Sequence, residues 1–232
     1  MILTYTIARD FLSCPHKAYR RHVVKNIPFT STPEMEKGNK VHDAIKRRIE
    51  QGKVFEDENL RQLEPLMATF DTTDKPVRVE YFIGMQRDGS PCAWDAERCW
   101  FRGKPDLALL SPPNCWLIDW KTGKPWEDPF ELQCQAMLVH AHHQSITLFT
   151  GEYYWLREMQ PGRRYTPVEL QPYLAYEKLG TIAKQMAEYG QRGVELGAME
   201  NPGKAWPKRP SKLCGWCDVK DCEHHPEGGE DL

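Results

Sequence analysis

The 232-residue chain has no long run of apolar residues, so we expect no segment that spans a membrane. Its N-terminus lacks the charged-then-apolar layout of a signal peptide, which favours the cytoplasm. No GxxxxGK[ST] phosphate-binding loop occurs, so an attached NTP-driven motor is not expected. An excess of either charge is also lacking: the net charge is −2, and a polyanionic partner would need a local basic patch. The length fits one domain with elaborations better than two full domains.

Cysteine, in contrast, is abundant. Eight cysteines without an export signal favour a reducing compartment, where metal ligation is more common than a disulfide framework. Cys214, Cys217 and Cys222 form a C-x-x-C with a third cysteine five positions on, and three close thiolates call for one further ligand. Cys14 precedes Pro15 at the expected start of a helix, where the positive helix end favours the thiolate. His224 or His225 is an alternative fourth ligand, which would suit zinc. The remaining four cysteines fit ordinary free thiols.

The chemistry is expected around the apolar segment 117–123. Because strand side chains alternate between faces, Asp119 and Lys121 project from the same face of one strand. A carboxylate there can hold a divalent cation, and the lysine can steady an anionic nucleophile or developing negative charge. Asp106 precedes a second apolar run, and residues 111–114 predict the turn of a hairpin that brings both acids to one metal. The alternative is that these are surface charges at strand ends.

Three further side chains are candidates with weaker signals. His42 flanks the apolar stripe of a predicted helix, where a histidine is usually a packing or surface residue. Glu80 lies in a predicted strand over Val77–Met85 and is either a further metal-site acid or a strand-surface glutamate. Gln133 lies in a predicted helix from Phe130 to His143.

The most basic run of the chain lies near its N-terminus. Lys17, Arg20, Arg21, His22 and Lys25 occur within nine positions. Such a run is either a solvated helix face or a surface that contacts phosphates. The slightly negative net charge makes this the first candidate for a local basic patch.

Taken together, Pro105-Asp106 and Asp119-Trp120-Lys121 resemble the PD…(D/E)xK motif of the RecB-like branch of the PD-(D/E)XK nucleases. The resemblance implies an α/β fold, a restriction-endonuclease-like core with a mixed central sheet flanked by helices. It also implies that His42, the histidine of a G-x-x-x-H motif, joins Asp106 and Asp119 in holding Mg²⁺ or Mn²⁺, while Lys121 helps to position and activate the attacking water. Gln133 aligns with the glutamine of the family's Q-x-x-x-Y element, although methionine replaces the tyrosine.

The cysteines extend this resemblance. Cys14-Pro15 followed by an aromatic residue is similar to the N-terminal half of the iron–sulfur motif in AddB-like nucleases and in the CRISPR-associated (Cas-four) type of RecB-like nuclease. Cys214, Cys217 and Cys222 are similar to its C-terminal half. The resemblance therefore implies a [4Fe-4S] cluster on these four thiolates, with structural Zn²⁺ as the alternative. A single domain 1–232 is expected, in which 1–30 and 197–225 form the cluster subdomain.

The function that this resemblance implies is a metal-dependent DNA exonuclease acting on single-stranded ends, in DNA repair, recombination or phage DNA processing. A CRISPR adaptation nuclease with protein partners would share the same site. A non-catalytic DNA-binding module with a structural metal cluster is the alternative from another class. Strand polarity, DNA or RNA preference and oligomeric state are left open by the sequence.

Overall fold

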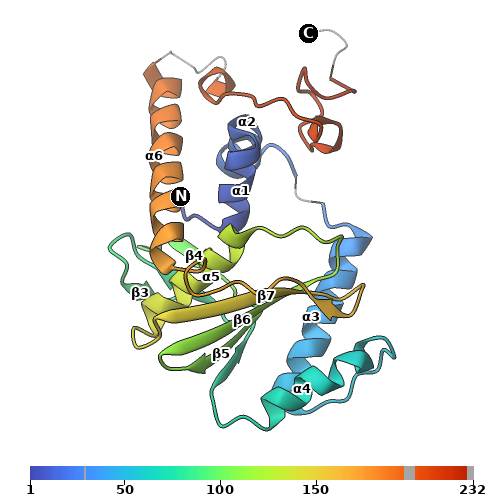
Figure 1. Cartoon of the computed structure of the whole chain (residues 1–232). Coiled ribbons are helices and arrows are strands. Elements are labelled where there is room, and N and C mark those ends of the chain that lie inside the picture. Colours follow the sequence, from blue (N-terminus) through green and yellow to red (C-terminus); the bar gives the residue numbers. More distant parts are fainter. Residues whose placement is uncertain (29, 196–201, 229–232) are drawn as a thin grey trace. The chain divides into compact units, whose positions relative to one another are not determined.

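The computed structural model describes residues 1–28, 30–195 and 202–228 (Figure 1). The chain forms two compact units, which are treated separately. Unit 1 consists of Met1–Ile2 and Ser31–Tyr176, and unit 2 of Leu3–Thr30 and Glu177–Leu232. No helix among the described residues is long and apolar enough to cross a membrane.

Unit 1 is built on a five-stranded mixed sheet of order β1-β5-β6-β7-β8. The central strands β6 and β7 are parallel, and the other neighbours are antiparallel. Helix α5 connects β6 to β7, as a parallel pair requires. The expected α/β fold with a mixed sheet flanked by helices is thereby confirmed. The strands are β1 (Val77–Val79), β5 (Leu107–Ser111), β6 (Asn114–Lys121), β7 (Leu148–Trp155) and β8 (Gln160–Pro161), and α5 is Pro129–His142.

The two faces of the sheet are covered by different helices. On one side, α3 (Pro33–Gln51), a 3-10 turn (Leu60–Leu63) and α4 (Glu64–Asp71) enclose a core that includes Ile118 and Trp120 of β6. Asp119 and Lys121 alternate with these residues and contact α5 on the other side. Helix α3 begins where the Thr32 hydroxyl accepts a hydrogen bond from the Met35 N–H at 3.3 Å. The hairpin predicted around residues 111–114 is confirmed by the pairing of β5 with β6.

The predicted single strand Val77–Met85 is wrong. It is two strands, β1 and β2 (Ile83–Met85), and β2 belongs to a second sheet with β3 (Pro91–Cys92) and β4 (Phe101–Gly103). The break falls at Glu80, whose φ of 48° is left-handed. There the Glu80 N–H donates to the Asp106 carbonyl at 2.9 Å and the Tyr81 N–H to the Pro105 carbonyl at 3.0 Å. Such strained backbone persists only where its surroundings impose it, and here it turns Glu80 out of the strand.

Unit 2 is helical and has an aromatic core. It contains α1 (Tyr5–Ser13), α2 (Pro15–Ala18), a π-helical turn (Tyr19–Val23), residues 177–195 of α6 (Pro172–Glu195), and 3-10 turns at Pro202–Ala205 and Cys214–Trp216. Trp206 is only 4% exposed; it stacks on Tyr19 at 5.2 Å between ring centroids and meets Phe11 and Tyr189 edge-on at 6.2 and 5.7 Å. These contacts join N-terminal and C-terminal segments of the chain. The predicted division into one domain with a cluster subdomain stays a prediction.

Candidate functional site

Three side chains from separate elements of unit 1 converge on one point. His42 comes from α3, Glu80 from the bend after β1, and Asp106 from the residue before β5. One ligand atom from each lies within 4.8 Å of the other two. The His42 Nδ1 lies 3.1 Å from Glu80 Oε1 and 3.5 Å from Asp106 Oδ1. An imidazole nitrogen with two carboxylate oxygens forms a donor set suited to Mg²⁺ or Mn²⁺.

The backbone of β6 fixes this group in place. The Trp120 N–H donates to Asp106 Oδ2 at 2.9 Å, and the Trp120 carbonyl lies 3.2 Å from His42 Nε2. The two hydrogen bonds tie both side chains to the same residue of the central strand. His42 therefore has a structural partner on one ring nitrogen and the carboxylates on the other.

Electrostatics at this point favour a cation. Burial lowers the pKa of His42, but hydrogen bonds and charges from Asp106 and Glu80 outweigh burial and raise that pKa to about 10. Burial raises the pKa of Glu80, but His42 and Lys104 outweigh it and lower that pKa below its usual range. Lys104 forms an ion pair with the second Glu80 oxygen. Positive charge thus balances these carboxylates from two sides, the role that a bound divalent ion would also fill.

Asp119 and Lys121 form a second, adjoining arrangement with α5. The Lys121 Nζ lies 2.6 Å from Asp119 Oδ2 and 2.9 Å from Glu131 Oε2. The other Asp119 oxygen accepts a hydrogen bond from Gln135 Nε2 at 2.7 Å. Burial, followed by repulsion from Glu131 and Asp106, raises the pKa of Asp119. Burial opposes the lysine charge, but the two carboxylates hold the pKa of Lys121 above its usual range, so Lys121 is a protonated donor.

The predicted metal ligands are only partly gathered. The structure brings His42 and Asp106 together, and among the described residues the third member of the group is Glu80. Asp119 is close enough to Asp106 for their repulsion to raise the pKa of Asp119, but its oxygens are occupied by Lys121 and Gln135. Its role as a ligand stays a prediction. The sequence left the role of Glu80 open because an unbroken strand would not have turned it toward His42.

Gln133, the predicted helix residue of the site, makes its side-chain contact elsewhere in unit 1, and its role stays a prediction. Its side-chain amide donates to the Glu169 carbonyl at 2.8 Å, whereas Gln135 contacts Asp119. Residues two apart on a helix point about 200° apart, so only one of these glutamines can face the sheet acids. Glu131 and Gln135 are four apart and share a helix face. The signal that would have found both is the Glu131-x-x-x-Gln135 spacing in a helix that follows the D-x-K strand.

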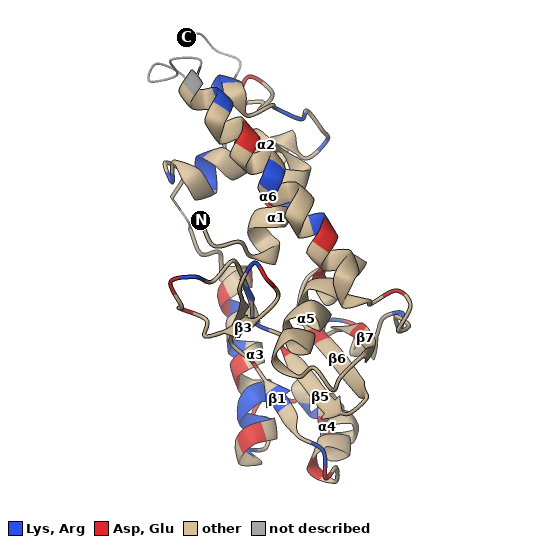
Figure 2. Cartoon of the chain, turned by 90° about the vertical axis from the view of Figure 1, so that its left-hand side faces the viewer, with Lys and Arg blue, Asp and Glu red and all other residues tan. Residues whose placement is uncertain are grey.

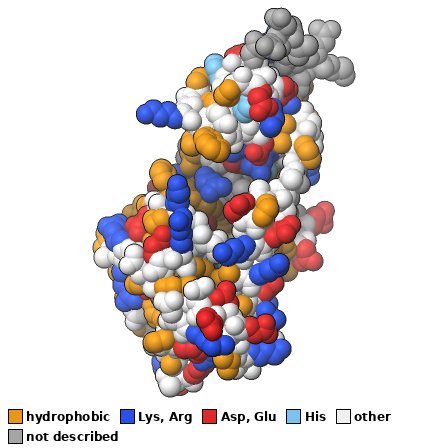
Figure 3. All heavy atoms as spheres, turned by 90° about the vertical axis from the view of Figure 1, so that its right-hand side faces the viewer, with side chains coloured by type: hydrophobic (Ala, Val, Ile, Leu, Met, Phe, Trp, Pro, Cys, Tyr) orange, Lys and Arg blue, Asp and Glu red, His pale blue; other side chains and the backbone are white. Residues whose placement is uncertain are grey.

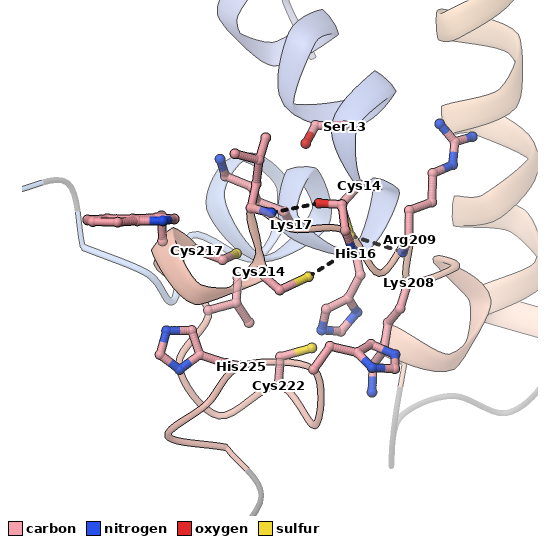
Figure 4. Close-up of a pocket in the computed structure, with 15 residues that line it drawn as sticks. Ser13, Cys14, His16, Lys17, Lys208, Arg209, Cys214, Cys217, Cys222 and His225 are labelled. Carbon is pink, nitrogen blue, oxygen red and sulfur yellow. Dashed lines mark hydrogen bonds between the residues drawn. The ribbon is translucent and has the colours of Figure 1, made fainter.

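The four cysteines of the predicted cluster all lie in unit 2. Cys14, Cys214, Cys217 and Cys222 line one cavity of about 220 Å³ (Figure 4). Two of the sulfurs accept backbone hydrogen bonds, Cys14 from the Arg209 N–H at 3.5 Å and Cys214 from the Ser211 N–H at 3.3 Å. The other four cysteines lie in unit 1. They are Cys92, Cys99, Cys115 and Cys134.

The spacing of these sulfurs bears on the metal. Thiolates ~2.3 Å from one tetrahedral zinc lie about 3.8 Å from one another. In the described part of the chain, no three cysteine or histidine ligand atoms of this cavity lie within 4.8 Å of one another. The side chains therefore face one cavity without forming a closed single-ion site. In a polynuclear cluster each thiolate binds a different iron, which permits wider spacing.

The basic run near the N-terminus does not form an open cationic surface. The side chain of Asp10 is only 2% exposed, and its carboxylate oxygens bind three basic groups. The Lys17 Nζ and the Arg21 guanidinium each lie 3.1 Å from one of these oxygens, and the His22 Nε2 lies 2.8 Å away. Arg20 forms a bidentate pair with Asp221. Acidic side chains thus pair with most of the cations in the run. These cations are therefore neither a freely solvated helix face nor a surface that is open to phosphates. On the face shown in Figure 3, basic and acidic side chains are interspersed.

Comparison with known proteins gives the family. The model of the PD-(D/E)XK nuclease superfamily matches residues 2–222. No curated protein matches. Among solved structures, the crystal structure of SSO0001 is similar over 94% of this chain and 83% of that chain, with 12% sequence identity and a TM-score of 0.46. Because the family match runs through the acid-bearing hairpin and reaches the C-terminal cysteines, we conclude that the chain belongs to the PD-(D/E)XK nuclease superfamily, in which metal-dependent nuclease activity is expected.

Proposed function

We propose that the protein is a metal-dependent DNA exonuclease that acts on single-stranded ends. One observation carries the proposal: the His42, Glu80 and Asp106 group adjoins a protonated lysine, Lys121, that two carboxylates hold in place. A metal site beside a fixed cation suits phosphodiester hydrolysis, because both stabilise the negative charge that develops on the phosphate as water attacks.

The roles of the residues follow from their contacts. His42 and Asp106, with Asp119 or Glu80, would hold Mg²⁺ or Mn²⁺, which when bound lowers the pKa of water and polarises the phosphate. Lys121 donates a hydrogen bond to the nucleophile or to a phosphate oxygen. Glu131 and Gln135 act as positioning residues. Glu131 accepts a hydrogen bond from the Lys121 ammonium at 2.9 Å, and the Gln135 amide donates one to the Asp119 carboxylate at 2.7 Å.

A track for the phosphate backbone is available on α3, the helix that carries His42 (Figure 2). Lys37, Lys40 and Arg47 of this helix and Lys53 just after it line a cavity of about 260 Å³, which apolar residues and the carboxylates of Glu56 and Asp57 also line. Within the described ranges, no carboxylate lies within 4.0 Å of these four cations. They are therefore better placed to bind phosphates than the paired cations of unit 2.

A cleavage assay tests this function. End-labelled single strands, duplex DNA and RNA are incubated with the protein and Mg²⁺, Mn²⁺ or EDTA. We expect stepwise shortening of single-stranded DNA that requires the ion and that Asp106→Asn abolishes. The label position gives the polarity. If no nucleic acid is shortened with either ion, the enzymatic proposal is wrong and a non-catalytic DNA-binding module replaces it.

We further propose that Cys14, Cys214, Cys217 and Cys222 bind a [4Fe-4S] cluster. The shared cavity and the backbone N–H groups aimed at two sulfurs support this. Protein purified without oxygen should be brown and contain about four irons per chain. One zinc and no iron would assign a structural zinc site, with a histidine of the same cavity as a possible substitute ligand.

We propose that the protein acts in DNA repair, recombination or phage DNA processing. A nuclease of CRISPR adaptation would use the same site. The four free thiols of unit 1 favour a reducing compartment, the cytoplasm of a cell or of a phage host. Co-purification with integration or recombination proteins would separate the settings.

A further inference from the structure

An aromatic pair lies beside the small second sheet of unit 1, with Phe82 just before β2 and Trp94 two residues after β3. Phe82 is 54% exposed, although it is large and apolar, and its ring meets that of Trp94 edge-to-face with 5.1 Å between centroids. Two cations accompany the pair. The Arg102 guanidinium lies 4.7 Å from the centre of the Trp94 ring, and the Lys104 Nζ lies 5.5 Å from the centre of the Phe82 ring. We call Phe82, Trp94, Arg102 and Lys104 the aromatic patch.

The backbone holds this patch in a fixed form. Pairing of β2 with β4 places Ile83 opposite Gly103, so the preceding Phe82 lies beside Lys104. The Arg102 side chain donates to the Trp94 carbonyl at 3.3 Å. The segment before Trp94 packs tightly on β2, because a Cβ at Gly84 would come within 2.9 Å of the Ala93 carbonyl. The rings are therefore presented by paired strands and a closely packed connection.

The aromatic patch is linked directly to the metal-binding group. Lys104 forms an ion pair with Glu80, and Glu80 lies 3.1 Å from His42. The same lysine approaches the Phe82 ring. Only Tyr81 separates Glu80 from Phe82 in the chain. A strand whose phosphate reaches the metal-binding group would thus have an adjoining nucleotide at Phe82.

We propose that the aromatic patch is a stacking subsite for a nucleobase next to the scissile phosphate of a single strand. The exposed Phe82 ring offers a face for the base, and Arg102 and Lys104 supply positive charge for the backbone. Because every base has a flat π-face, such a subsite tolerates all sequences, and it rejects duplex DNA, whose bases are already stacked. The inference rests on the proposed nuclease function and identifies the substrate element that this side of the site contacts.

The experiment compares oligonucleotides in which one abasic nucleotide is moved along the strand. For the wild-type protein, kcat/KM should fall about tenfold when the abasic nucleotide occupies the position next to the scissile bond, because stacking is lost there alone. Phe82→Ala should lower cleavage of normal strands by about the same factor and respond little to that abasic nucleotide. Phe82→Trp should restore both. Tyr173→Ala is the matched control, since Tyr173 is also 54% exposed in unit 1.

Binding gives a readout independent of cleavage. With Ca²⁺ in place of the catalytic ion, 2-aminopurine at the same position should be quenched by the wild type and by Tyr173→Ala but not by Phe82→Ala. Cleavage that is indifferent to the abasic position, or equal quenching by all variants, would overturn the stacking subsite and leave the nuclease function intact. If no strand is cleaved with any ion, the proposed function fails, and the quenching result alone decides the subsite.

Discussion

The carboxylate–histidine group of unit 1 and the cysteine cavity of unit 2 are the two candidate metal sites, and they are built differently. In unit 1 the candidate ligands His42, Glu80, Asp106 and Asp119 are all held by protein partners at hydrogen-bond or ion-pair distance. In unit 2 the four sulfurs face one cavity, and the hydrogen bonds to Cys14 and Cys214 come from backbone N–H groups.

The difference concerns what each unit needs in order to fold. The unit 1 group stands on a mixed sheet with a large apolar core, so it is organised before any ion binds. The cysteine segment after Trp206 is mostly exposed and includes Trp216 at 87% and Leu213 at 66% exposed. A segment with so little buried apolar surface depends on cross-links for its structure. Loss of a metal ligand in unit 1 should therefore affect catalysis, and loss of a cysteine ligand in unit 2 should affect the folding of the cysteine segment.

The largest effect is expected at the cysteines. Cys217→Ser should remove the metal and the visible absorption and leave residues 207–228 open to protease, because structural metals contribute on the order of 10 kcal/mol to the segments they hold. Limited proteolysis with mass spectrometry locates the cleavage. Cys92→Ser replaces a half-exposed cysteine of unit 1 and should change neither the metal content nor the digestion pattern. An unchanged metal content and digestion pattern in Cys217→Ser would remove the distinction between the units.

Substitutions at the D-x-K strand should affect turnover instead. Asp119→Asn and Lys121→Ala should each lower kcat on the order of a hundredfold or more, since each supplies a few kcal/mol to the transition state. Lys121→Ala should leave metal affinity nearly unchanged, because an ammonium group cannot bind a cation. Single-turnover cleavage and metal titration separate the two effects. Lys184→Ala, in an exposed lysine of α6, is the control, and near-wild-type rates for either site variant would refute the assignment.

A smaller effect is expected at Asp10. Burial raises the pKa of Asp10, but His22, Lys17 and Arg21 outweigh burial and lower it. A depressed pKa stabilises the folded state above the ordinary carboxyl pKa of about 3.9, and this contribution is lost as pH falls through the folded value. Asp10→Asn should lower the free energy of unfolding by about 2 kcal/mol at neutral pH and by less in acid. Denaturant titrations at both pH values, with the 83% exposed Asp74→Asn as control, test this.

The smallest effect separates two glutamines of one helix. Gln135→Leu should lower kcat about tenfold, because Asp119 loses a charge-assisted hydrogen bond that orients it. Gln133→Leu should stay within about twofold, since its amide contacts the Glu169 carbonyl. Comparing kcat of the two variants is the measurement. A larger loss for Gln133→Leu would mean that helix α5 is rotated in the active form.

Local sequence sufficed for the hairpin and for the shared face of Asp119 and Lys121. Strand alternation and turn residues determine both features within a few positions of the chain. The helix that carries His42 was predictable for the same reason, since Pro33 with the acidic residues after it and a helical apolar stripe specify it. The resemblance to a known family, and not the pattern around it, singled out His42 as a ligand.

Tertiary structure alone decided the rest. The bend that turns Glu80 toward His42 depends on backbone hydrogen bonds to Pro105 and Asp106, more than twenty residues away. Which of Gln133 and Gln135 faces Asp119 depends on how α5 lies on the sheet, and whether Lys17 and Arg21 are free depends on the buried Asp10. Local propensity acts over a few residues, whereas the bend at Glu80 and the contacts of Asp10 and Asp119 are set by packing between separate elements, on which propensity has no influence.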